Sequence, residues 1–209
     1  MLSDPAAIEE KSLALIEEEM GPHRFSRREL ALVKRAIHAT ADFDFAKTIV
    51  IHPDAVQAGI EAIRSGAGVV ADVQMVEVGL SKERLQRFGG GVSCFISDPD
   101  VIADAKQEGL TRAILAMRKA VRLHPQAIYA IGNAPTALLE LIRLVETGEA
   151  KPSLIVGVPV GFVSAAESKE RLERWAGVPF VTCRGRKGGS AVAVAIVNAL
   201  SLLAIQETG

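Results

Sequence analysis

The chain has 209 residues, of which 49% are hydrophobic and only 4% are aromatic. This length suffices for one large α/β domain with an aliphatic core, and the hydrophobic fraction excludes a disordered chain. A formal net charge of −1 gives no general electrostatic attraction to nucleic acid or to an anionic membrane.

The sequence shows no pattern of a redox motif, a signal peptide or a membrane-spanning segment. Cys94 and Cys183 lie in strand-like segments without a CxxC spacing, which predicts a reduced protein of the cytoplasm. The N-terminus lacks the basic start and apolar run of a signal peptide. The longest apolar stretch, 191–205, is interrupted by polar residues and is shorter than the roughly 20 residues that span a bilayer.

Three helices are predicted before the first buried strand, and the third extends over Pro53–Ser65 and ends at Gly66. Asp4 and Pro5 begin a helix that extends to about Met20, and Ser12 lies in its apolar row. The Ser12 hydroxyl either bonds back to the helix or faces a ligand. Ser26 caps the second helix, with Glu29 placed for a capping box.

Five later segments are short and continuously apolar, as in strands covered on both faces. They are 68–73, 92–96, 127–131, 154–158 and 180–183, with 48–51 as a candidate edge strand. Helical patterns separate them at 98–105, 110–123, 135–146, 165–175 and 190–205. We therefore predict an α/β fold: a doubly wound, flavodoxin-like three-layer domain with a five-stranded, mainly parallel sheet plus N-terminal helices, in a single domain spanning 1–209.

Ligands of such sheets bind outside the carboxyl ends of the strands. Asn133 follows the third predicted strand, and Arg186 lies in the basic, glycine-rich segment 184–190 after the fifth, where helix-terminal amides favour an anion. A nucleotide or flavin phosphate is disfavoured, because neither GxxxxGK[ST] nor GxGxxG occurs. The four histidines show no HExxH spacing, so we predict no protein-bound metal, and no GxSxG is present for a hydrolase.

Arg35 and His38 are the most informative pair. Leu30, Val33, Ile37 and Ala41 form a core-facing stripe, and Arg35 and His38 leave the same helix face beside it. A permanent cation next to a group that titrates near neutrality can hold an anion and move a proton. The alternative is that His38 caps or packs against the helix end and that Arg35 is a solvated surface charge.

Two further segments invite interpretation. Arg112 lies in the first turn of its helix, where a cation is disfavoured, which indicates either a function or a surface salt bridge. The segment 191–197 is apolar nearly all round, so it helps to bury a subunit interface unless a neighbouring helix covers it.

Four motifs in order, at 35–44, 131–137, 157–169 and 184–190, closely resemble the precorrin-8X methylmutase (precorrin isomerase) family of cobalamin biosynthesis. The similarity runs from about Ser12 to Ala199. It implies a cytoplasmic homodimer that moves the methyl group of precorrin-8X, or of cobalt-precorrin-8, from C-11 to C-12. The product would be hydrogenobyrinate or cobyrinate, a corrin held tightly, and no cofactor is used.

The resemblance also implies roles for individual residues. His38 matches the family's proton donor or acceptor, while Ser12, Arg35, Arg112 and Lys169 match substrate contacts. With Asn133 and Arg186 from the strand ends, they form the predicted substrate-binding set. The alternative function is a non-catalytic tetrapyrrole or corrinoid carrier.

Overall fold

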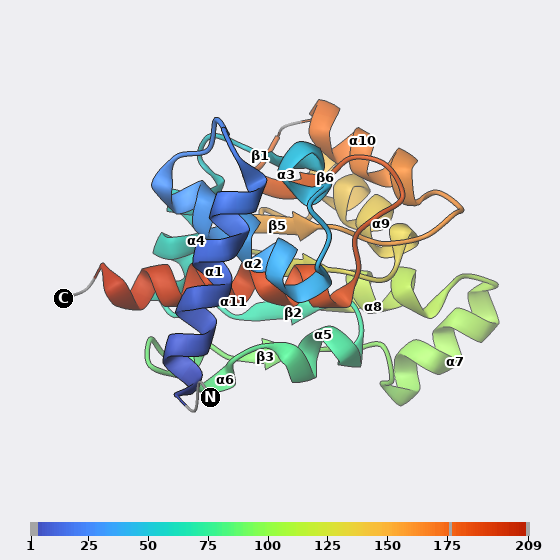
Figure 1. Cartoon of the computed structure of the whole chain (residues 1–209). Coiled ribbons are helices and arrows are strands. Elements are labelled where there is room, and N and C mark those ends of the chain that lie inside the picture. Colours follow the sequence, from blue (N-terminus) through green and yellow to red (C-terminus); the bar gives the residue numbers. More distant parts are fainter. Residues whose placement is uncertain (1–3, 176, 208–209) are drawn as a thin grey trace.

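A single mixed sheet runs through the centre of the molecule (Figure 1). In the computed structural model, which describes residues 4–175 and 177–207, the six strands follow the order β1-β6-β5-β4-β2-β3. They are β1 (Ile49–Ile51), β2 (Val69–Ala71), β3 (Val92–Ser93), β4 (Ile128–Ile131), β5 (Leu154–Gly157) and β6 (Phe180–Cys183).

The five predicted parallel strands are all present, so the fold class is confirmed. Counted from β2 to β6, they lie in the order 2-1-3-4-5, the flavodoxin-like arrangement. The predicted count of five is short by one, because β1 pairs antiparallel with β6, with Ile49 opposite Cys183. This sixth strand is the candidate edge strand.

Helices cover both faces of the sheet. One face carries α1 (Pro5–Met20), α2 (Arg27–Thr40), α4 (Ala55–Arg64), α5 (Gln74–Gly79) and α11 (Ser190–Gln206); the other carries α8 (Arg112–Leu123), α9 (Pro135–Glu146) and α10 (Ala165–Trp175). Strand side chains alternate between the two cores: Val69 and Ala71 join the first, and Val70 joins the second. Continuous burial thus explains the unbroken apolar runs of the sequence.

The N-terminal helices begin where the sequence predicts. The Asp4 side chain caps α1 by accepting from the Ala6 N–H, and Pro5 is the first helical residue. Ser26 and Glu29 form the complete capping box of α2. Figure 1 shows α1 in dark blue at the α2 side of the molecule, and none of its residues is buried.

Three short helices were not predicted. They are α3 (Phe45–Thr48), α5 and α6 (Lys82–Gln86), and α7 (Pro99–Glu108) is longer than expected. The strand predicted over 68–73 ends at Ala71, because the next residue, Asp72, turns to bind the backbone of a neighbouring loop. The strand predicted over 92–96 ends at Ser93.

Helix α11 is covered mainly from within the chain. It packs on α2, α4 and α5 and lies across β4 and β5, which buries eight of its residues. A row of partly exposed residues remains, with Val194, Ala195 and Asn198 among them. The neighbouring-helix explanation therefore accounts for most of its apolar surface, and the row borders the candidate site.

Candidate active site

His38 lies in the last turn of α2 with its side chain exposed, and Arg35 is half-buried one turn earlier. Leu30, Val33 and Ile37 are buried as the stripe predicts. Ala41 is a correction: it is exposed and ends the helix in the left-handed conformation, with φ 51°. Among the described residues, the imidazole forms no hydrogen bond with a backbone carbonyl or a side chain, so His38 does not cap the helix.

The imidazole borders a cavity of about 330 Å³ between α2, α6 and α11. Its walls are mainly aliphatic, and Arg35 and Arg84 are the two cationic residues that line it. The complete lining is Arg35, His38, Ala39, Arg84, Ala191, Val194, Ala195, Asn198, Ala199 and Leu202. An imidazole, two arginines and an apolar wall therefore meet at one place.

Helix α1 reaches this cluster through Glu9, which forms an ion pair with Arg35. The hydrogen bond from Arg35 holds the pKa of the Glu9 carboxyl below its usual range. Ser12 is three residues after Glu9 and shares its helix face, so it lies on the side of α1 that meets α2. Its hydroxyl donates to the Ile8 carbonyl at 2.8 Å, the back-bonded state that the sequence allowed.

At the carboxyl edge of the sheet, the chain supplies an anion of its own. The buried Asp72 carboxylate follows β2 and accepts N–H bonds from Gly132 (3.1 Å), Asn133 (2.8 Å) and Ala134 (2.8 Å). Burial raises the pKa of Asp72 against the opposing effect of these hydrogen bonds. The Asp72 carboxylate thus occupies the amides before α9, at the point where the strand order reverses. These amides are not free to bind a phosphate, which agrees with the lack of a nucleotide motif.

Arg112 and Asn133 lie at neighbouring helix starts. Thr111 and Thr136 share a hydrogen bond of 3.2 Å between their hydroxyls, which joins the first turns of α8 and α9. The Asn133 side chain is exposed, and so is Arg112. Within the described part of the chain, Arg112 forms no ion pair. A surface salt bridge therefore does not explain why this cation stands in the first turn of α8.

Arg186 lies on the loop between β6 and α11, away from the His38 cavity lining. Its guanidinium carbon is 5.4 Å from the centroid of the Phe162 ring, which is 84% exposed. The loop passes so close to the chain after β5 that a Cβ at Gly188 (φ 151°) would lie 2.2 Å from the Val158 carbonyl oxygen. Only glycine permits this approach.

The first turn of α11 connects the two groups of residues. A Cβ on Gly132 would lie 2.7 Å from the Ser190 Cα, so the Asn133 loop packs directly on this turn. The next residue, Ala191, lines the His38 cavity. The structure thus brings together Ser12, Arg35 and His38, places Arg112 and Asn133 on the other side of the α11 start, and leaves Arg186 on its own loop.

Lys169 of α10 is enclosed, with an exposed fraction of 1%. Its ammonium donates to the Lys187 backbone carbonyl and lies 3.6 Å from the Cys183 sulfur. Burial lowers the pKa of Lys169 and raises that of Cys183. The ammonium therefore faces the back of the β6–α11 loop rather than an open cavity.

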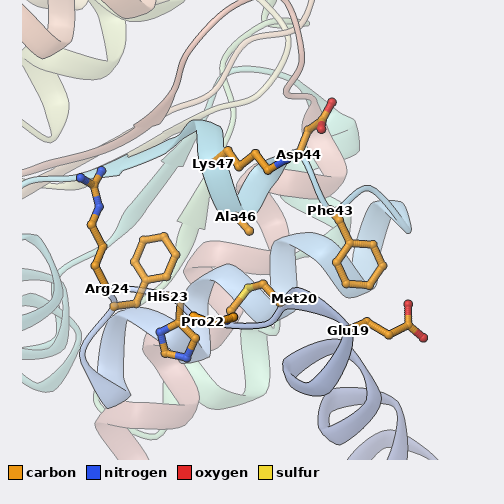
Figure 2. Close-up of a pocket in the computed structure, with 10 residues that line it drawn as sticks. Glu19, Met20, Pro22, His23, Arg24, Phe43, Asp44, Ala46 and Lys47 are labelled. Carbon is orange, nitrogen blue, oxygen red and sulfur yellow. The ribbon is translucent and has the colours of Figure 1, made fainter.

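A larger cavity, of about 730 Å³, lies elsewhere and contains none of the predicted site residues (Figure 2). Figure 2 shows His23 and Arg24, from the α1–α2 connection, on one side and Asp44 and Lys47, from the α3 region, on the other. Its lining mixes cations, carboxylates and aromatic rings without the histidine–arginine pair. Cavity size alone would therefore select a place that holds none of the predicted site residues.

The described residues contain no cluster of three or more histidine, cysteine or acidic side chains placed to hold a metal ion. In the same part of the chain, no helix is both long and apolar enough to cross a membrane.

Comparisons with known proteins show which family the chain resembles. The precorrin-8X methylmutase family profile matches residues 7–203. A cobalt-precorrin-8 methylmutase from Priestia megaterium is 58% identical over 96% of this chain and 88% of its own. One from Leptospira interrogans is 52% identical over 94% and 92%. The crystal structure of precorrin-8X methyl mutase from Thermus thermophilus superposes with a TM-score of 0.90, at 43% identity and 97% coverage of both chains.

The chain belongs to the precorrin-8X methylmutase family. The predicted family, the predicted isomerase and its place in cobalamin biosynthesis are confirmed. The fold of this methylmutase matches that of the solved relative over nearly its full length.

Several residues of the methylmutase site escaped sequence reasoning. Arg84 lies on α6, a helix of five residues that is too short for a periodic signal. Glu9 contacts a partner far away in sequence, Arg35. Asp72 was recognisable as a residue directly after a predicted strand, where ligand-binding groups are expected, but its hydrogen bonds to the amides before α9 were not predicted.

Proposed function

We propose that this chain catalyses the migration of the C-11 methyl group of a precorrin-8 macrocycle to C-12, with His38 as the proton donor. The observation that carries the proposal is the exposed imidazole of His38 at the edge of an apolar cavity, between Arg35 and Arg84. Protonation of the ring system lowers the barrier to redistributing π electrons as the methyl group moves. General acid assistance of this kind contributes about 10²- to 10⁴-fold to a rate.

The substrate is a broad apolar macrocycle fringed with acetate and propionate carboxylates. Arginines grip carboxylates through two parallel hydrogen bonds, so Arg35, Arg112 and Arg186 are proposed to hold the fringe, with Ser12 and Asn133 as neutral partners. The ammonium of Lys169 is buried, so we propose that Lys169 supports substrate binding indirectly. It holds the β6–α11 loop, which carries Arg186. We favour the cobalt-loaded substrate, since the relatives at 58% and 52% identity are both named for it.

A homodimer completes the site in this proposal. Small-molecule sites occupy roughly 300–1,000 Å³, so a cavity of about 330 Å³ is too small to enclose a corrin with its side chains. Apolar residues are also exposed on neighbouring helices: Met75 and Val78 of α5, which packs on α11, are 70% and 74% exposed, and no residue of α1 is buried. A second copy packed here supplies the missing wall and retains the product tightly, in the cytoplasm where the pathway operates.

The test is single-turnover conversion, followed by the absorption spectrum, of metal-free and cobalt-loaded precorrin-8. We expect His38→Ala to abolish the spectral change while the variant folds and still binds the corrin product. His23→Ala is the matched control, because His23 lines the larger cavity and should convert substrate at the wild-type rate. Near wild-type turnover by His38→Ala contradicts the proton role, and binding without conversion by the wild type supports a carrier instead.

A further inference from the structure

A chain of polar contacts joins α10 to the end of the helix that carries His38. The enclosed ammonium of Lys169 donates to the Lys187 carbonyl. The ammonium of Lys187 in turn donates to Asp42 Oδ2 and Asp44 Oδ2, each at 2.6 Å. Asp42 is four residues after His38, directly beyond the end of α2.

We propose that Lys169 and Lys187 are positioning residues for His38, which fix the last turn of α2 from behind without touching the substrate. The inference rests on the proposed role of His38 and deepens it. Neither lysine lines the cavity at the imidazole.

Lys169 is an unusual residue for a structural role alone. It is 1% exposed, and within the described residues it forms no ion pair; its polar neighbours are the Lys187 carbonyl and the Cys183 thiol. An ammonium buried without a carboxylate costs stability, and an apolar side chain of similar size often replaces such a group without loss. The ammonium of Lys169 donates to one strong acceptor, the Lys187 carbonyl. We therefore expect Lys169 to act by holding the β6–α11 loop in place.

The end of α2 is a segment that needs support. Ala41 adopts φ 51°, a left-handed conformation that is unfavourable for a residue other than glycine. The surrounding turn is tied by the Asp44 N–H to Asp42 Oδ1 (3.0 Å) and by the Asp42 N–H to Thr40 Oγ1 (3.3 Å). Strained backbone persists only where its surroundings over-determine it, and the double contact of Lys187 supplies the long-range part.

The consequence is a separation of rate from binding. Release of Lys187 lets the last turn fray, so the imidazole loses its fixed direction towards the cavity. A misplaced catalytic group costs rate, whereas the apolar wall and the arginines that bind the macrocycle stay in place.

The experiment uses Lys187→Met and a matched control. Lys119 bridges Asp98 Oδ2 (2.6 Å) and Asp100 Oδ2 (2.7 Å) in the same two-carboxylate geometry, away from the His38 cavity. We expect Lys187→Met to slow single-turnover conversion of cobalt-precorrin-8 by about 10- to 100-fold. Its Kd for the corrin product should stay within about threefold of wild type, and Lys119→Met should change neither quantity. Lys187→Arg should restore most of the rate, because its fork reaches both carboxylates.

Lys169→Met extends the test to the buried member. It should slow conversion by about tenfold while its melting temperature stays equal to or above that of the wild type, because a buried charge is removed. A fall in melting temperature that accounts for the lost activity would contradict the positioning role of Lys169.

Coupling and a readout without substrate complete the design. Asp42→Asn with Asp44→Asn should slow conversion as Lys187→Met does, and the combined variant should be no slower. Amide hydrogen exchange in the last turn of α2 should accelerate in Lys187→Met and stay unchanged in Lys119→Met. Additive losses, unchanged exchange, or a raised product Kd with a retained rate would each overturn the inference.

The failure of this inference can be told from the failure of the proposed function. If His38→Ala is inactive while Lys187→Met behaves as wild type, only this inference fails. If His38→Ala is active, the proposed function fails.

Discussion

The carboxylate of Glu9 pairs with the guanidinium of Arg35, so a residue of α1 occupies the cation that stands one turn before His38. The carboxylate also feels the positive field of His38 and Arg84, both of which favour its ionised form. Without substrate, an internal anion thus neutralises the cationic edge of the cavity. A substrate carboxylate must displace Glu9 from Arg35 or share Arg35 with it.

Glu9→Gln is expected to tighten binding of the corrin product. The substitution removes a negative charge that competes with the carboxylate fringe, at the expense of one partly exposed ion pair worth less than about 1 kcal/mol. Titration of product into wild type and variant should give a several-fold lower Kd for the variant at low salt, and the gap should shrink as salt screens the charges. Glu10→Gln is the control; weaker binding by Glu9→Gln would mean that Glu9 orients Arg35 rather than competing with the ligand.

Arg112 is expected to contribute binding without contributing stability. Arg112→Met should raise the product Kd by about tenfold, the size of one lost charge-assisted hydrogen bond. The melting temperature should not fall, because the residue is exposed at the first turn of α8. Arg122→Met, in the last turn of the same helix, removes a cation that suits the helix dipole and should leave the Kd unchanged. Equal effects of both variants would indicate general electrostatic attraction instead of a contact.

The sequence predicted the large elements because their signals are local. The buried parallel strands appear as apolar runs, and Pro135–Glu146 and Ala165–Trp175 match the predicted helices residue for residue. The short helices α5 and α6 carry too few residues for a periodic pattern, and α5 is fixed by its contact with α11. At Gly79, for example, a Cβ would lie 2.7 Å from a Val194 methyl carbon, a constraint that no local pattern reveals.

The candidate site divides in the same way. Arg35 and His38 were recognisable together because three residues of one helix separate them, and the family motifs named Ser12 and Arg112. The burial of Lys169 and the ion pair of Lys187 with Asp42 depend on contacts between segments far apart in the chain. Such contacts cannot be predicted from a single sequence. Long-range contacts thus decided which predicted cation faces a cavity and which faces the backbone.

Glu140 should make the fold sensitive to acid. Burial opposes ionisation of its carboxyl, but hydrogen bonds from Arg143 and Arg118 outweigh that effect and hold the pKa of Glu140 below its usual value. A carboxyl with a lowered pKa in the folded state stabilises the protein above the unfolded value of about 4.3 and loses this contribution as the pH falls. The free energy of unfolding should therefore decline below about pH 5.

Glu140→Gln should remove part of that decline. At pH 7 the variant should be less stable by about 2 kcal/mol, the range for hydrogen bonds to a charged group. Denaturant unfolding from pH 3 to pH 7 should show the gap between variant and wild type closing towards acid. Glu170→Gln, which loses only an exposed contact to Arg174 within α10, is the control and should follow the wild-type curve. A gap that stays constant with pH would mean that lost packing, not charge, explains the destabilisation.

The proposed dimer predicts that a charge on the outer row of α1 separates the subunits. Leu15 is 45% exposed on a helix that buries none of its residues in one chain. Leu15→Glu should turn a wild-type dimer into a monomer in sedimentation equilibrium, because a carboxylate cannot be buried there without a partner. Leu123→Glu tests a leucine that is 56% exposed at the end of α8 and should stay dimeric.

The decisive comparison is between assembly and turnover. If the second copy supplies the missing wall of the His38 cavity, the Leu15→Glu monomer should bind the corrin product weakly and convert substrate slowly, and both defects should lessen as protein concentration rises. A monomeric variant with full activity would mean that one chain suffices for the reaction. A wild type that sediments as a monomer at every concentration would contradict the proposed dimer. The substrate itself, or a rearranged α1, would then have to cover the exposed apolar side chains of α1.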